Sequence, residues 1–288
     1  MTIRAFELLR PKSLVEASEL LLKYGEEARP IAGGTTLVIL MKQRTVHFPY
    51  LVDLQGLSGL DHISEQDGWI RIGAMATQRS VERSPLIQRS LPVLAEAFSK
   101  VGNIRVREMA SVGGNLAHAD YRLDPPPALL ILGADLVLSG PNGTRTVAIK
   151  DFYRGMYKTA LETAEILSEV RIPPMPDGSQ AVYLKYRSLS ANDWPCLGVA
   201  ALLSQTGGRC QELRLALSGL ASTPLQVQGL DFVQDQPLTD RLLEEVAGVV
   251  DEQISPLSDL RGSEWYKREL ARVFIKRAIR EVERRLSA

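Results

Sequence analysis

A proline-rich break at residues 173–178, Pro-Pro-Met-Pro-Asp-Gly, most constrains how this chain of 288 residues folds. Neither a helix nor a central strand continues through these prolines, because proline lacks the backbone donor that both need. Beyond the break the pattern changes to three strand-like segments and then two helical ones: 181–187, 197–204, 213–218, 239–250 and 263–286. Strands followed by helices are typical of an α+β domain. We therefore expect a separate C-terminal α+β domain over residues 177–288.

Short helices and strands alternate before the break. Ser13 and Glu16 have the spacing of a capping box at the start of a helix that Gly25 would end. A helical stretch over 77–98 is broken by Pro85 and Pro92. The remaining expectations are strands at 30–32, 50–54, 69–73 and 166–172, a hairpin over 134–149 and an irregular stretch over 110–127.

The first segment that could carry chemistry is a glycine pair between a strand and a helix. Ala32, Gly33, Gly34, Thr35 and Thr36 follow the expected strand at 30–32 and precede the apolar run 37–41. Glycine lets a ligand approach the backbone, and the free amides at a helix start favour an anion such as a pyrophosphate. The alternative is a tight turn with no ligand.

A second glycine pair lies in the expected irregular stretch. Ser111, Gly113, Gly114 and Asn115 again combine a hydroxyl, two glycines and an amide, and Asp124 follows beside three prolines. A carboxylate placed there would accept the hydroxyls of a ribose; the alternative is a loop aspartate in an Asx-turn. His118, in the same stretch, is interpreted as an ordinary loop histidine, with ligand contact as the alternative.

Other classes of site are excluded or unsupported. The chain has no G-x-G-x-x-G, Walker, H-E-x-x-H or G-x-S-x-G motif, and its two cysteines, Cys196 and Cys210, cannot make a four-thiolate site. Because 34 basic residues balance 34 acidic ones, no net charge attracts nucleic acid or an anionic membrane. No apolar run approaches the ~20 residues of a membrane span. We predict no metal site, no catalytic side chain and a cytoplasmic location.

The last helical segment is rich in Lys and Arg. Its apolar residues repeat every four positions, so we interpret it as an amphipathic helix with a solvated basic face. A docking surface for an acidic partner is the alternative.

Taken together, the two glycine segments resemble the FAD-binding medium subunits of the molybdenum hydroxylases. Further matching blocks are 72–74, 165–173, 183–186 and 261–266, in the order and at the separations of that family. The resemblance implies a vanillyl-alcohol-oxidase-type (PCMH-type) FAD-binding fold in two α+β lobes, 1–57 and 58–176, ahead of the smaller C-terminal domain.

The resemblance also implies a division of labour among chains. The two glycine segments would hold the FAD pyrophosphate, Asp124 the ribose, and Leu167 and Lys185 would line the flavin; a surface lysine is the alternative for Lys185. A small subunit with two [2Fe–2S] clusters would deliver electrons from a large molybdenum-cofactor subunit to FAD on this chain, in a dimer of heterotrimers. Reduced FAD would then pass them to an external acceptor that the sequence does not identify.

Two features set this chain apart within the family. Asp120 is followed by Tyr121 and Arg122 where many members have Asp-Pro, so contacts to the adenosine half would differ. Two cysteines cannot hold the extra cluster of the 4-hydroxybenzoyl-CoA reductase branch, so no cluster is expected here. The alternatives in function are a self-sufficient flavin oxidoreductase and a non-catalytic nucleotide-binding scaffold.

Overall fold

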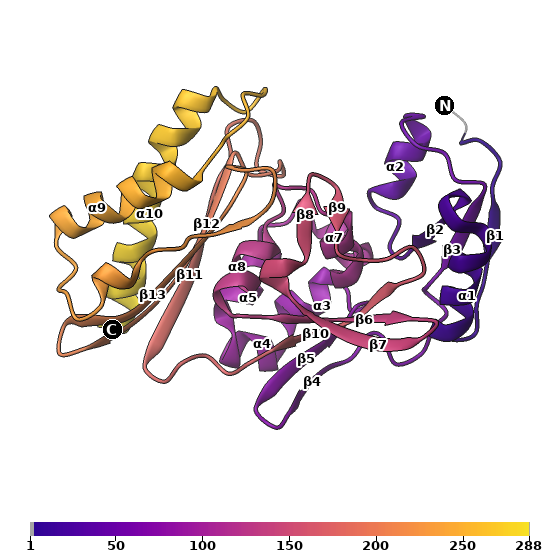
Figure 1. The fold of residues 1–288 in the computed structure, drawn as a ribbon, viewed down its shortest axis with the longest axis horizontal. Helices are drawn as coiled ribbons and strands as arrows, with labels where there is room; N and C mark the ends of the chain where they lie inside the picture. The colour runs from indigo at the N-terminus through magenta and orange to yellow at the C-terminus, as the bar shows by residue number, and fades with distance from the viewer. Residues whose placement is uncertain (1–2, 288) are drawn as a thin grey trace.

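The three larger sheets of the described chain, each with its own helices, follow one another along the molecule, and a fourth, two-stranded sheet is the hairpin of residues 153–159 (Figure 1). The computed structural model describes residues 3–287. The N-terminal sheet and its helices lie at one end, the C-terminal sheet with the last two helices at the other, and the largest sheet lies between them (Figure 1). No helix in this described range is both long enough and apolar enough to span a bilayer.

The N-terminal lobe is a small parallel sheet in the order β1-β3-β2. Helix α1 begins where the sequence predicts, because the Ser13 hydroxyl accepts the Glu16 amide at 3.1 Å, and ends at Gly25 with φ 53°. The Glu16 carboxylate reaches back to the Lys12 amide at 2.6 Å, one residue before the amide that a capping box would use. The elements are β1 (Glu7–Leu9), α1 (Leu14–Tyr24), β2 (Ala28–Ile31), α2 (Leu37–Lys42) and β3 (Tyr50–Asp53).

The middle lobe packs helices against one face of a five-stranded sheet in the order β4-β5-β10-β6-β7. Pro85 and Pro92 are the first residues of new helices, where their missing amide costs nothing. Its helices are α3 (Gln78–Arg83), α4 (Pro85–Ser90), α5 (Pro92–Ser99), α6 (Ile104–Met109), α7 (Val112–His118) and α8 (Pro125–Ile131). Its strands are β4 (Ile63–Gln66), β5 (Trp69–Gly73), β6 (Asp135–Gly140), β7 (Gly143–Ala148), the hairpin β8 (Tyr153–Gly155) and β9 (Lys158–Thr159), and β10 (Ile166–Ile172).

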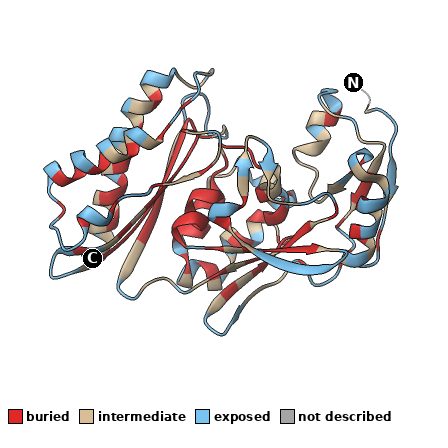
Figure 2. Cartoon of the chain, viewed as in Figure 1, coloured by how far each residue is buried: buried red, intermediate tan, exposed pale blue. Residues whose placement is uncertain are grey.

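The expectation of an irregular stretch over residues 110–127 is wrong, because α7 and α8 occupy much of it. Ser111 caps α7 by accepting the Gly114 amide at 3.1 Å, so the second glycine pair lies in the first turn of a helix. The three prolines begin α8, since a first helical turn needs no amide donors. Every residue of α8 is buried (Figure 2).

The C-terminal domain is an antiparallel sheet, β11-β12-β13-β14, covered by two helices. Its elements are β11 (Ser179–Tyr186), β12 (Leu197–Thr206), β13 (Arg209–Ser218), β14 (Leu225–Gln226), α9 (Asp240–Gln253) and α10 (Glu264–Leu286). The predicted order of three strands and two helices is confirmed, with the turn at Gly207 and Gly208.

The expectation of an amphipathic α10 with a solvated basic face is confirmed, since Ala278 and Val282 are buried while Arg272 and Arg284 are 48% and 69% exposed; the buried Lys267 is the exception. Most of these basic side chains are also ion-paired. Arg272, Lys276 and Arg280 form ion pairs with Asp251, Glu244 and Asp240 of the antiparallel neighbour α9. Arg284 and Arg285 pair with Glu281 of α10 itself. The acidic partner considered for this helix is therefore supplied largely by the chain's own α9.

Candidate cofactor site

The first glycine segment, residues 32–36, connects β2 to α2. Gly34 has φ +65°, a conformation that a side chain disfavours. Gly33 lies against the neighbouring backbone: a Cβ on it would stand 1.8 Å from the carbonyl oxygen of Met109. Its missing side chain therefore allows the N-terminal lobe to contact α6, rather than leaving space for a ligand.

The second glycine segment, residues 111–115, is held by the strand-to-helix connection at residues 74–77. The Gly113 amide donates to the Ala74 carbonyl at 2.7 Å, and a Cβ on Gly113 would meet the Ala74 Cβ at 2.6 Å. A Cβ on Gly114 would lie 3.7 Å from that of Ala32. The two glycine segments, far apart in sequence, are thus neighbours in the structure.

Asn115 has a buried side-chain oxygen, Oδ1, with no hydrogen-bond partner among the described residues. Buried polar atoms are nearly always paired, so an unpaired one calls for a ligand or a water. This atom belongs to the second glycine segment, where a bound donor would satisfy it. The residues present therefore fit a ligand at this place.

Leu167 reaches the same region through β10. It is 4% exposed and lies opposite Leu138, at a register shift between Leu167 and Glu169. The carbonyl of Ser168, within that shift, accepts the Ala74 amide at 2.9 Å. The shifted segment of β10 therefore contacts the same residue that holds Gly113.

Asp124 and Lys185 form a buried ion pair between the middle lobe and the C-terminal domain. Lys185 Nζ donates to Asp124 Oδ2 at 2.8 Å, and their side chains are 1% and 3% exposed. Asp124 makes no Asx-type bond to its own helix, and Lys185 is not at the surface, so both alternatives considered for these residues are wrong.

The environment of the pair shifts both ionisation equilibria. Burial raises the pKa of Asp124 to about 6, against the opposing effect of Lys185 and of the Tyr183 hydroxyl. Burial also lowers the pKa of Lys185, with Asp124 acting in the opposite direction. Each member of the pair therefore stabilises the charged form of the other.

Tyr183, which sequence reasoning did not select, completes this cluster. Its hydroxyl donates to Asp124 Oδ1 at 2.7 Å, so both oxygens of the carboxylate are occupied by protein donors. The available signal was its place two residues before Lys185, since alternate residues of a strand share one face.

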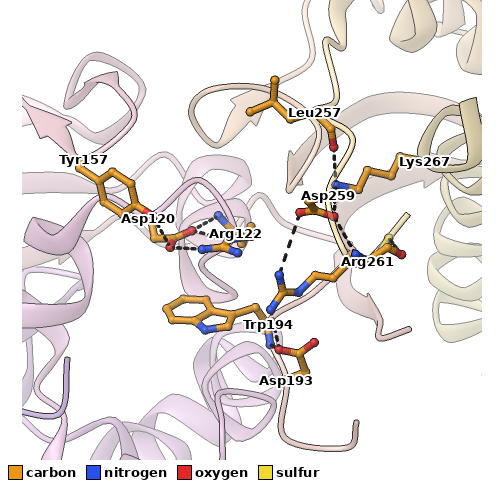
Figure 3. A network of polar contacts seen from close by, with 10 residues as sticks. Asp120, Arg122, Tyr157, Asp193, Trp194, Leu257, Asp259, Arg261 and Lys267 are labelled. Carbon is orange, nitrogen blue, oxygen red and sulfur yellow. Dashed lines mark hydrogen bonds and ion pairs between the residues drawn. The ribbon is translucent and has the colours of Figure 1, made fainter. Parts of the chain in front are cut away.

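A second polar network crosses from the middle lobe to the C-terminal domain (Figure 3). Asp120 receives two bonds from the Arg122 guanidinium, at 2.9 and 2.7 Å, one from the Arg122 backbone amide at 2.9 Å and one from the Tyr157 hydroxyl at 3.1 Å. The Arg122 guanidinium lies over the ring of Trp194, 5.4 Å from its centre. Asp120 and Arg122, where the sequence departs from the family pattern, therefore connect the two domains.

Four ionisable side chains continue this network within the C-terminal domain. Arg261 donates to Asp193 at 2.7 Å, and the buried Lys267 pairs with Asp259 at 2.9 Å (Figure 3).

His118 lies on α7 rather than in a loop, with its ring tilted against Tyr157 at 5.4 Å between ring centres, and burial lowers its pKa. Within the described part of the chain, no three His, Cys, Asp or Glu side chains are grouped to bind a metal.

Two family models divide the chain between them. The FAD binding domain in molybdopterin dehydrogenase matches residues 4–175, and the CO dehydrogenase flavoprotein C-terminal domain matches residues 182–282. The carbon monoxide dehydrogenase medium chain of Afipia carboxidovorans is 35% identical over 282 residues, 98% of each chain. A putative xanthine dehydrogenase FAD-binding subunit of Escherichia coli is 31% identical over 275 residues, 94% of each.

Solved structures agree with these matches. Carbon monoxide dehydrogenase from Hydrogenophaga pseudoflava superposes with a TM-score of 0.96 at 33% identity, over 99% of each chain. Quinoline 2-oxidoreductase from Pseudomonas putida 86 gives 0.94 at 31% identity over the full length of both. The expected fold class, a two-lobed FAD-binding fold with a C-terminal α+β domain, is confirmed. The chain belongs to the family of FAD-binding medium subunits of the molybdenum hydroxylases.

Proposed function

We propose that this chain binds FAD and transfers electrons within a multi-chain molybdenum hydroxylase. The observation that carries the proposal is the contact of the two glycine segments, which come from different lobes and meet at Ala32 and Gly114 beside the unpaired Asn115 Oδ1. Backbone amides of the first segment would bind the pyrophosphate, with the side chains of Thr35, Thr36 and Ser111 at its edge. The amides of Val112, Gly113 and Gly114 already donate within the protein, so the second segment would hold the ligand through its side chains and its close backbone approach. When bound, the flavin supplies the redox chemistry, and the protein binds and orients it.

Lys185 would provide positive charge at the flavin, which Leu167 would also line. An ammonium has three protons, and Lys185 donates two of them, to Asp124 and to the Lys100 carbonyl at 2.8 Å. The third has no acceptor among the described residues, and because the side chain is 1% exposed, a ligand would reach it only from within the interface between the two domains. Asp124 would hold Lys185; a direct bond to a ribose hydroxyl requires it to give up one of its two present partners.

The names of the relatives support the proposed partner chains. Those chains are named as medium chains or FAD-binding subunits of dehydrogenases. We propose that a small chain with two [2Fe–2S] clusters delivers electrons from a large chain with the molybdenum cofactor, in a cytoplasmic dimer of heterotrimers. The division at residues 57 and 176 into two FAD-binding lobes and a C-terminal domain belongs to the same proposal.

Co-expression of the chain with its neighbouring large and small reading frames tests the proposal. The purified complex is expected to contain one FAD per copy of this chain, together with iron and molybdenum on the other chains. A Ser111→Ala, Asn115→Ala variant should assemble but lose most of its FAD. Flavin retained at full occupancy in that variant would contradict the site. Substrate oxidation by this chain alone would instead favour a self-sufficient flavin oxidoreductase.

A further inference from the structure

Tyr183 connects the C-terminal domain to the charge pair of the middle lobe. Its side chain is completely buried, and its hydroxyl donates to Asp124 Oδ1 at 2.7 Å. Lys185, on the same face of β11, donates to the other carboxylate oxygen. Two donors on one strand of the neighbouring domain, Tyr183 and Lys185, therefore hold Asp124.

The position of the Tyr183 hydroxyl depends on a glycine in the next strand. A Cβ on Gly198 would lie 2.4 Å from this hydroxyl and 2.5 Å from Ser218 Oγ. Gly198 pairs with Lys185 in the antiparallel register, so β12 is bare directly opposite the lysine and leaves room for the tyrosine. This is an observation independent of the hydrogen bond.

Backbone contacts fix the tyrosine further. Its amide donates to Glu96 Oε2 at 3.2 Å, and its carbonyl accepts Lys100 Nζ. Lys100 also lies over the Tyr183 ring, 5.4 Å from its centre. These contacts hold the backbone and ring of Tyr183, so its hydroxyl offers a fixed donor to one oxygen of Asp124.

The hydroxyl also affects the charge of Asp124. Burial favours the neutral acid, whereas each hydrogen bond donated to the carboxylate favours the ionised form. A protonated Asp124 leaves the buried ammonium of Lys185 without a counter-ion. The ionisable groups around the Asp124–Lys185 pair are Tyr183, Lys100, Glu96 and Arg285. Arg187 and Asp193 act on Lys185 in addition.

We propose that Tyr183 is a positioning residue, whose hydroxyl keeps Asp124 ionised and so holds Lys185 in place as an ammonium. That Lys185 then faces the flavin rests on the proposed function. The effect of Tyr183 on Asp124 does not, because it involves only residues of this chain. The two parts can therefore fail separately.

Difference infrared spectroscopy of the full chain tests the first part directly. The carbonyl stretch of protonated Asp124, identified by its loss in Asp124→Asn, is followed as the pH is lowered through about 6. Tyr183→Phe keeps the ring and removes the hydroxyl, so the midpoint should rise by about one pH unit. Gly198→Ala, which displaces the hydroxyl, should shift the midpoint in the same direction.

The matched control is Tyr153→Phe, because the Tyr153 hydroxyl is buried with no partner among the described residues. It should leave the Asp124 midpoint unchanged. A midpoint that does not move in Tyr183→Phe, or moves equally in the control, overturns the inference.

The second readout is the affinity of the assembled complex for FAD as a function of pH. Affinity should fall as Asp124 is protonated, so Tyr183→Phe should move this profile upward by the same amount as the infrared midpoint. A complex that binds no FAD would overturn the proposed function, while the infrared titration would still decide the role of Tyr183. A shifted infrared midpoint with an unshifted FAD profile would show that Lys185 does not act on the flavin.

Discussion

Gly33 and the carbonyl oxygen of Met109 are in such close contact that a Cβ on the glycine would lie 1.8 Å from that oxygen. The contact joins the N-terminal lobe to the end of α6, two residues before the second glycine segment begins. The position of the two segments relative to each other therefore depends on this backbone contact between lobes.

Gly33→Ala is expected to separate the two glycine segments. Overpacking of this kind typically costs about 1–3 kcal/mol, and here the neighbour is backbone and cannot rotate away. FAD content of the complex should fall sharply, and urea unfolding should show the loss of stability. Gly56→Ala is the control, because nothing lies within 4 Å of its Cβ position. Equal behaviour of the two variants would contradict the proposed importance of the contact.

Gly248→Ala should stabilise the chain. Gly248 lies within α9, is exposed, and has open space around its Cβ position. Alanine in a helix interior is favoured over glycine by about 1 kcal/mol. Thermal unfolding should therefore shift upward with FAD content unchanged, whereas a lower melting temperature would show that α9 tolerates no side chain there.

Local signals predicted the elements that local physics determines. Ser13, Gly25, Pro85 and Pro92 mark helix ends in the sequence, and the structure has helix ends there. Helix α7 was missed because a seven-residue helix containing Gly113 and Gly114 has poor intrinsic propensity. Its stability comes from the bonds of its first amides to Ala74 and Ala76, which a single sequence does not reveal.

The residues of the candidate site were likewise predicted where a local motif marks them and missed where contacts between distant segments decide. The family resemblance indicated both glycine segments, Asp124 and Lys185. It gave no indication that Gly33 packs on Met109 or that Tyr183 occupies the second oxygen of Asp124, because these contacts join different lobes and domains. The pairing of α10 with α9 was missed for a similar reason: charge spacing shows that a helix is basic, but not which helix lies beside it.

Two lysines of α10 should differ strongly in their contribution to stability. Lys267 is 1% exposed and binds Asp259 at 2.9 Å and the Leu257 carbonyl at 2.6 Å, whereas Lys276 makes a surface pair with Glu244. Breaking a buried pair costs about 3–5 kcal/mol, and a surface pair contributes about 0–1 kcal/mol. Lys267→Met should therefore destabilise the chain far more than Lys276→Met in urea unfolding. Similar losses in both variants would mean that the network of Figure 3 contributes little.

The stability of the chain should carry a pH signature of Asp124. Its pKa is raised to about 6 in the folded chain from an ordinary value of 3.8, so the folded state binds this proton more tightly than the unfolded state. The contribution is fully present below pH 3.8 and is lost as the pH rises through about 6. The free energy of unfolding of the wild type minus that of Asp124→Asn should therefore fall between these values. A difference that rises over this range would show a lowered pKa.

A double-mutant cycle at Asp124 and Lys185 should show strong coupling. Both side chains are buried and bonded at 2.8 Å, so removing either charge leaves the other buried and unpaired. Lys185→Met leaves the carboxylate buried without a counter-ion and is expected to cost about 3–5 kcal/mol in urea unfolding. Asp124→Asn should cost less, because burial raises the pKa of Asp124 and already disfavours its charge. The double variant removes both charges and should cost much less than the sum of the two. Additive losses would mean that the pair is not the origin of either effect, and Asp124 and Lys185 would then act independently at the site.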